Sequence, residues 1–272
     1  MKKIVLSTLL ISTLALTASA AVAKDQVKLQ ADIAAAKATK ATAEANLKAL
    51  ESQLPANEQV MSTVRLGYIN ATGNSETETF SLYANAKKAW NKHNASLTFD
   101  SQYGNANGET NANKYFIEGN YGYSFIPSLS VTGVIGYKND KFSSYNYQSY
   151  IGPGLKWATY KSDNQDLSLE GSILYSMDEL QVLDTDNNYG AYRAKILYAL
   201  NILDNLKFDQ ELSYKGSFDD ADNYFVFSRS ALSSKISDIF SAGISYKIDY
   251  TNLTVTDYRH DNTFEAFLSI DY

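Results

Sequence analysis

The chain has 272 residues and a formal net charge of −6 at pH 7, from 24 Lys and Arg against 30 Asp and Glu. It contains no Cys, which excludes a disulfide framework and thiolate chemistry, and its acidic balance argues against the basic surface that nucleic-acid binding requires. With 21 Tyr and only 3 Pro, the composition favours sheet over helix.

Residues 1–23 have the organisation of a secretory signal peptide. A basic start at Lys2 and Lys3 precedes a short apolar run, and small residues follow it. We expect cleavage after Ala23, with Ala20 as the alternative. A membrane anchor is the weaker interpretation, because the run falls short of the roughly 20 apolar residues that a spanning helix needs. No later stretch reaches that length, so the exported chain is expected to enter a membrane only as strands.

Residues 24–55 are expected to form a periplasmic helix that Pro55 ends. Apolar residues recur at alternating spacings of four and three from Leu29 to Leu54, with Lys40 as the one charged member of this heptad seam. One interpretation is a coiled coil that joins copies of the chain or contacts a partner in the periplasm. The other is a solvated spacer, because Ala at seam positions buries little. The sequence leaves both open.

From Val60 onward the helical period gives way to twelve short runs in which apolar and polar residues alternate, the period of a β-strand. Val64, Leu66 and Tyr68 mark the first run. The phase of the tenth run, near 224–236, is ambiguous. We therefore expect an all-β domain over residues 56–272.

The connections between these runs alternate in length. The expected tight turns are 91–94, 126–128, 161–165, 204–205 and 237–238. The expected longer polar links are 71–76, 104–112, 139–144, 178–188, 217–223 and 251–261. Short turns at one end and long loops at the other are typical of a transmembrane barrel. The sequence thus predicts a closed antiparallel up-and-down β-barrel, and an even strand number places both of its ends on the periplasmic side.

Charged residues fall on one face of the alternating runs and are expected to point into the barrel. The predicted lumen charges are Arg65, Lys114, Glu118, Glu170, Arg193, Lys195, Asp209, Glu211, Lys247, Asp249 and Glu265. Lys87, Asp100, Lys138, Lys156 and Asp271 share their phase. The opposite face carries Tyr and Trp near the strand ends, as at a lipid–water boundary, which favours a barrel over a β-sandwich. The charges either form ion pairs that hold the barrel in register or line a narrow polar passage.

The last run places Phe264, Leu268, Ile270 and Tyr272 on the apolar face, and no polar tail follows. A sheet in lipid must close, since an unpaired backbone group there costs several kcal/mol, so the last strand is expected to pair with the first. A terminal aromatic after alternating apolar residues resembles the signal that the barrel-assembly machinery of the outer membrane reads. That machinery is therefore an expected partner.

Several stretches resemble the salt-induced outer-membrane protein family, a β-barrel family catalogued as a domain of unknown function. They are Gly73-Asn74, Trp90, the stretch YGNANGETNANKY at 103–115 and DKFSSYNYQSYIGPGLKW at 140–157. The resemblance covers about residues 60–272 and leaves the expected helix outside. It implies an outer-membrane barrel and induction by salt, but it supplies no agreed substrate or catalytic residues.

No catalytic, cofactor or metal site is predicted. His93 falls in an expected tight turn and should be solvated. His260 lies among charged residues in the last long loop, which a solvated polar loop explains. The acidic residues after Asp184 miss the calcium-loop pattern, because its sixth position lacks Gly and its twelfth is Lys195.

We therefore expect a non-enzymatic protein in the outer membrane of a Gram-negative bacterium, with a role in envelope integrity or in the response to stress such as salt. The alternative is a narrow channel for ions or small solutes, and the third possibility is an enzyme at the barrel rim or an adhesin. Expected partners are outer-membrane lipid and lipopolysaccharide, the assembly machinery, and a second copy or periplasmic partner through residues 24–55. No nucleic acid and no cofactor are expected.

Overall fold

The computed structural model describes residues 37–39, 42, 60–71, 77–181, 185–254 and 259–271. The chain divides into two compact units, Met1–Ala56 and Asn57–Tyr272. In the first unit, residues 37–39 and Thr42 are helical, and the Thr42 hydroxyl donates a hydrogen bond of 2.9 Å to the Ala38 carbonyl. The expected signal peptide and the rest of the expected helix lie outside the described residues. In the part of the chain that is described, no helix combines the length and hydropathy needed to cross a membrane.

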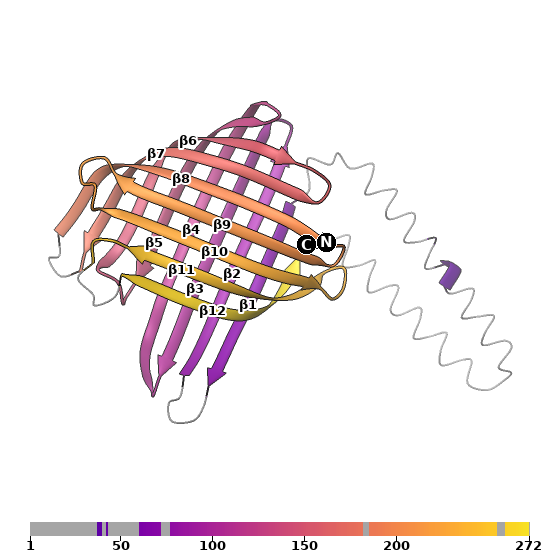
Figure 1. The fold of residues 1–272 in the computed structure, drawn as a ribbon, viewed down its shortest axis with the longest axis horizontal. Coiled ribbons are helices and arrows are strands. Elements are labelled where there is room, and N and C mark those ends of the chain that lie inside the picture. Colours follow the sequence, from indigo (N-terminus) through magenta and orange to yellow (C-terminus); the bar gives the residue numbers. More distant parts are fainter. Residues whose placement is uncertain are drawn as a thin grey trace. The chain divides into compact units, whose positions relative to one another are not determined.

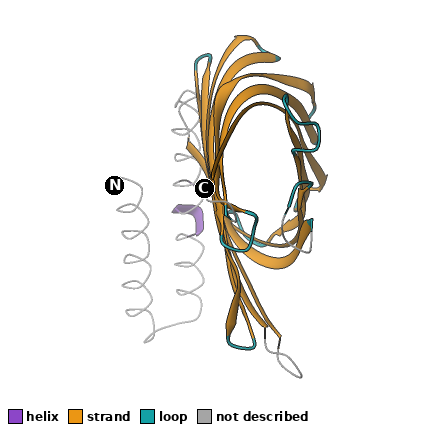
Figure 2. Cartoon of the chain, turned by 90° about the vertical axis from the view of Figure 1, so that its left-hand side faces the viewer, coloured by secondary structure: helices purple, strands orange, loops and turns teal. Residues whose placement is uncertain are grey.

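The second unit is a closed barrel of twelve antiparallel strands, in which each strand pairs with its neighbours in sequence and β12 pairs with β1 (Figures 1 and 2). The strands are β1 Val60–Ala71, β2 Thr77–Trp90, β3 His93–Ala106, β4 Glu109–Ile126, β5 Leu129–Asp140, β6 Tyr145–Lys161, β7 Gln165–Leu180, β8 Thr185–Leu203, β9 Leu206–Ser217, β10 Tyr224–Lys235, β11 Phe240–Thr251 and β12 His260–Asp271. The expected fold class is confirmed.

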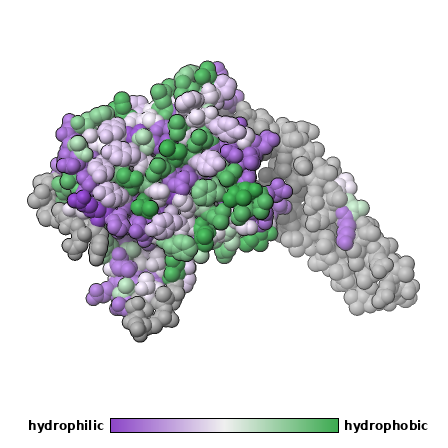
Figure 3. Space-filling model, in the orientation of Figure 1, coloured by the Kyte–Doolittle hydropathy of each residue, from purple (hydrophilic) through white to green (hydrophobic). Residues whose placement is uncertain are grey.

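Strand alternation separates the two faces of the wall. On β1, Val64 and Leu66 point outward and are 38% and 49% exposed, whereas Gly67, the residue after Leu66, is buried. The same alternation recurs on β12, where Phe264 and Leu268 are 57% and 63% exposed. Figure 3 shows one side of this outer surface, where apolar residues spread over the strands. The apolar face predicted from the sequence thus lies outside the barrel.

The first and last strands close the wall through five residue pairs, from Thr63 opposite Asp271 to Gly67 opposite Phe267. The Thr63 hydroxyl also donates a hydrogen bond of 2.7 Å to the Asp271 carboxylate. Ile270 points outward, as expected for the predicted assembly signal, and is 47% exposed. Tyr272 lies outside the described residues, and recognition by the assembly machinery stays a prediction.

The long polar link predicted over 104–112 is wrong. β3 continues to Ala106 and β4 begins at Glu109, so that two residues, Asn107 and Gly108, join them. Both have positive φ, 52° and 83°, as a tight hairpin turn with right-handed strand twist requires. The many Asn residues suggested a loop, but the Asn-Gly pair is a hairpin signal and the flanking residues continue the ladder. The link predicted over 178–188 is likewise shorter, since β7 reaches Leu180.

The prediction that His93 is solvated in a turn is wrong as well. The turn consists of residues 91 and 92, with Asn91 at a φ of 51°, and His93 is the first residue of β3. Its ring stacks on Trp90 with centroids 5.6 Å apart, and its Nδ1 lies 2.7 Å from the Tyr121 hydroxyl. The histidine therefore belongs to an aromatic group at the turn end of the barrel.

Tyrosines form a second aromatic group at the loop end. Tyr192, Tyr214, Tyr224 and Tyr250 stack in order across β8 to β11, with ring centroids 5.9, 5.6 and 5.9 Å apart. Neighbouring strands place outward residues side by side, so one tyrosine per strand produces a continuous ladder. Aromatic groups at both ends of an apolar wall are the arrangement found where a barrel meets two membrane interfaces.

Candidate functional site: the charged lumen

Seven charged side chains form one chain of alternating sign inside the barrel. We call it the lumen ion-pair chain, and its members in order are Arg193, Glu118, Lys195, Glu211, Arg229, Asp100 and Lys247. Successive nitrogen–oxygen distances are 2.5, 3.2, 3.0, 2.6, 3.2 and 3.1 Å. Four cations and three carboxylates thus make an unbroken series of contacts.

The lumen ion-pair chain joins opposite walls. Glu118 lies on β4 and its partner Arg193 on β8, while Asp100 lies on β3 and its partner Lys247 on β11. These strands are not neighbours in the barrel. The contacts therefore cross the interior instead of following the ladder of adjacent strands, and they occupy the middle of the lumen.

Glu118 is the most enclosed member, with 3% of its side chain exposed. Besides the two cations, it accepts hydrogen bonds from the Tyr150 hydroxyl at 2.5 Å and from the Asn120 amide at 3.0 Å. The Tyr150 ring fits because Gly136 on β5 has no side chain, since a Cβ there would overlap the ring. A charge so far from water is tolerated only when it is paired and hydrogen-bonded, and Glu118 meets both conditions.

A second set of charges lies nearer the loop end. Asp249 on β11 pairs with Lys138 at 3.2 Å and with Lys114 at 3.6 Å. Lys114 also reaches Asp261 at 3.7 Å. As in the lumen ion-pair chain, one carboxylate is shared between two cations from the opposite wall.

Lys215 is enclosed by aromatic rings. Its Nζ lies 4.5 Å from the Phe225 ring centroid and 5.5 Å from that of Tyr150. The nearest carboxylate is that of the buried Asp178, at 4.0 Å, which also accepts a hydrogen bond of 2.7 Å from the Tyr189 hydroxyl. Rings that face an ammonium group stabilise its charge. Only 8% of Lys215 is exposed, so little of it is available to a solute.

The turn end of the lumen contains a looser set of charges. Lys156 pairs with Glu170 at 3.0 Å, and Asp209 pairs with Lys207 at 2.8 Å and with Arg65 at 3.9 Å. Lys87 also points into this region, yet it makes no ion pair with any described residue.

A cavity of about 540 Å³ follows the inside of the barrel. Its wall includes Lys87 and Ser128 from the turn end, Phe225 and Thr251 from the loop end, and every member of the lumen ion-pair chain between them. Polar side chains line most of its length. The cavity thus has lining residues from both ends of the barrel, with the lumen ion-pair chain between them.

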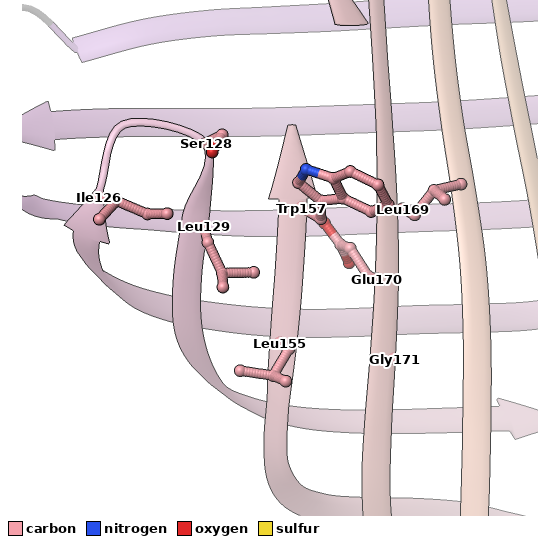
Figure 4. A pocket seen from close by; sticks show the side chains of 8 residues that line it. All are labelled: Ile126, Ser128, Leu129, Leu155, Trp157, Leu169, Glu170 and Gly171. Atoms are coloured by element: carbon pink, nitrogen blue, oxygen red, sulfur yellow. The ribbon is translucent and has the colours of Figure 1, made fainter. Parts of the chain in front are cut away.

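A shallower cavity of about 460 Å³ lies on the outer face near the turn end. Figure 4 shows Trp157 and Leu155 of β6 beside Leu129 of β5 and Leu169 of β7. Gly171 leaves the space open between these side chains. Its apolar lining continues the outer wall and offers no group for acid–base chemistry beyond Glu170, whose carboxylate is paired with Lys156.

The structure places each of the eleven predicted lumen charges in an ion pair or hydrogen bond of the inner wall, although their functional role stays a prediction. Glu265, for instance, accepts hydrogen bonds from Ser81 at 2.6 Å and from Ser245 at 2.7 Å. Lys195 pairs with Glu211 on the neighbouring strand at 3.0 Å, whereas Arg193 pairs across the lumen with Glu118.

The prediction did not identify Arg229 as a lumen residue. On β10, serines stand in both phases of the strand, so neither face carries a clear apolar pattern. The charge itself was the only available signal. Among the described residues, no group of three or more His, Asp or Glu side chains is placed to hold a metal ion. His260 begins β12 and is exposed.

Comparisons with known proteins identify the family. The chain belongs to the family described as Protein of unknown function, DUF481, whose model matches residues 64–272. The expected membership of a β-barrel family of unknown function is therefore confirmed. A search of curated protein sequences finds no match.

Solved structures with a similar fold include porins and channels. The NanC porin is 12% identical and covers 77% of this chain and 98% of its own, with a TM-score of 0.48. An outer membrane channel from Pseudomonas putida F1 is 6% identical. It covers 80% of this chain and 97% of its own, with a TM-score of 0.49. The KdgM porin in complex with disordered oligogalacturonate is 10% identical. It covers 77% of this chain and 99% of its own, with a TM-score of 0.43.

Proposed function

We propose that this barrel spans the outer membrane and that its lumen is a narrow passage for ions and small polar solutes. The observation that carries the proposal is the polar cavity that extends from the tight turns toward the long loops inside an apolar outer wall.

The outer wall supports a membrane location. Many large apolar side chains are exposed on this wall, which would be unfavourable in water. Ile173 is 64% exposed and Ile135 is 58% exposed. Strands of 12 to 19 residues exceed the roughly 9–11 that a tilted strand needs to cross the hydrocarbon core. Each strand pairs with two neighbours and β12 closes on β1 over five residue pairs, so the sheet leaves no edge strand unpaired in lipid.

The lumen supports a passage of small bore. Twelve strands enclose more space than the filled barrels of about eight strands and less than the open porins of 16–18. The lumen ion-pair chain takes up part of that space. Ions and small solutes that can exchange contacts with its charged groups fit this geometry better than large ones.

Planar-bilayer recording of purified barrel tests the proposal. The wild type should give small conductance steps. The double variant Asp100→Ser with Arg229→Ser removes a pair that joins β3 to β10 and should raise the unit conductance. The matched control is Lys235→Ser with Asp238→Ser, which removes an exposed pair outside the cavity and should leave the conductance unchanged.

A second candidate function rests on the same lumen ion-pair chain, which braces opposite walls. In that case the protein serves envelope integrity without conducting. Folded wild type and folded lumen variant that both give no steps would contradict the passage and favour the brace. A cell lacking the protein should then lose resistance to detergent, and the lumen variant should restore less resistance than the Lys235–Asp238 control.

A further inference from the structure

The lumen cavity is positively charged although the protein is acidic. The described residues that line it include ten Lys or Arg and five Asp or Glu, whereas the whole chain has 24 against 30. We infer that the turn end of this cavity is a binding site for small oxyanions, meaning carboxylates or phosphates, with Lys87 and Lys156 as their cationic partners. The role of this site in selectivity rests on the proposed passage, while binding itself does not.

Most cations of the cavity are already neutralised. Each of four carboxylates contacts two cations, and these carboxylates are Asp100, Glu118, Glu211 and Asp249. Lys215 is enclosed by aromatic rings. The middle and the loop end therefore have no cation that is both exposed and unpaired among the described lining residues. An incoming anion would have to break existing ion pairs there.

The turn end differs in this respect. Lys87, Lys88 and Lys156 line the cavity there together with Glu170, and the nearby Asp209 is already paired with Lys207 and Arg65. Glu170 is paired with Lys156. Lys87 is exposed, makes no ion pair with a described residue, and lies within electrostatic range of the cations Lys156 and Lys207 and of the carboxylates Asp209 and Glu211, which are themselves paired with other cations. Like charges held near one another in a polar cavity attract an anion, since the anion offsets their mutual repulsion.

The surrounding wall supplies hydrogen-bond donors. Asn94 and Ser96 of β3 and Thr132 of β5 line the same cavity, together with Ser128 in the turn before β5. Amides and hydroxyls complete the coordination of carboxylate or phosphate oxygens that a lysine contacts. The whole cavity measures about 540 Å³ and the turn end is one part of it, so we choose a small dicarboxylate, succinate, as the probe. Charge and donors thus agree on a small oxyanion.

Saturation-transfer NMR with succinate, on the folded full-length barrel in uncharged detergent micelles, tests binding directly. The wild type should transfer saturation to the succinate methylene protons. Lys87→Gln should weaken the affinity about fivefold, the effect of one charge at contact distance in a solvated site. Lys156→Gln should weaken it as well. Lys235→Gln is the matched control, because Lys235 is exposed and does not line the cavity, and it should bind like the wild type.

Two results would overturn the inference, namely no transfer to succinate from the wild type, or equal affinity in the wild type and Lys87→Gln. Reversal potentials in a KCl gradient give the second readout, where the wild type should favour chloride and Lys87→Glu should shift the preference toward potassium. Succinate binding without conductance would refute the passage and leave the site supported. Conductance without succinate binding would refute the site and leave the passage supported.

Discussion

Glu118→Ala tests how far the lumen charges stabilise the barrel. The substitution removes a carboxylate that contacts Arg193 at 2.5 Å and Lys195 at 3.2 Å and accepts the Tyr150 hydroxyl. Arg193 is 6% exposed and pairs with no second carboxylate among the described residues, so its charge would stay buried without a counterion. Lys195 keeps its contact with Glu211.

The size of the effect follows from this burial. Removing one partner of a buried ion pair costs about 3–5 kcal/mol, because the other charge is left uncompensated. We therefore expect Glu118→Ala to lower the free energy of unfolding by that amount. Glu170→Ala is the matched control, since it removes one carboxylate from the same lumen but from a pair whose lysine is 36% exposed. A pair so accessible to water contributes about 0–1 kcal/mol.

Urea unfolding in lipid vesicles, followed by the fluorescence of Trp90 and Trp157, measures both variants. The double variant Glu118→Met with Arg193→Met should recover part of the loss, because no buried charge then lacks a partner. A Glu118→Ala barrel within about 1 kcal/mol of the wild type, or no less stable than Glu170→Ala, would refute the claim that this pair is both buried and stabilising.

Three further predictions concern backbone and selectivity. Gly152→Ala should lower the free energy of unfolding by about 1–3 kcal/mol in the same assay, because the new Cβ would overlap the backbone oxygen of Ile173. Gly133→Ala is the control and should not weaken packing, because a Cβ there meets no atom within 4 Å. Gly108→Val should cost about 1–2 kcal/mol, since a φ of 83° strains a side chain, and a folded variant as stable as the wild type would contradict this. Asp249→Asn should move the reversal potential further toward chloride, and a shift toward potassium would be evidence against an anion-favouring lumen.

The wall of the barrel could be predicted from the sequence because alternation reports the face of each residue directly. On β11, apolar residues from Phe240 to Tyr250 alternate with lumen-facing residues such as Lys247, and one strand suffices to assign both faces. β10 was ambiguous because Ser228 and Ser233 put small polar residues on opposite faces, which also concealed Arg229.

Alternation along the strands could not predict which charges meet inside the barrel, and the reason is geometric. Alternation says that Glu118 and Arg193 face inward, but they are 75 residues apart and on strands that do not pair. Which charges meet across the lumen depends on strand tilt and stagger around the closed wall. Curvature of the closed wall brings Arg193 on β8 within reach of Glu118 on β4.

The long reach of Asp100 has a consequence for biogenesis. Its partners Arg229 and Lys247 stand 129 and 147 residues further along the chain, on strands that are synthesised late. If the sheet closed with one hairpin fewer, the facing wall would be rotated and the Asp100 carboxylate would lie opposite the wrong side chains. Strand number and interior charge are thereby linked, since the twelve-strand cylinder brings Asp100 to both of its counterions.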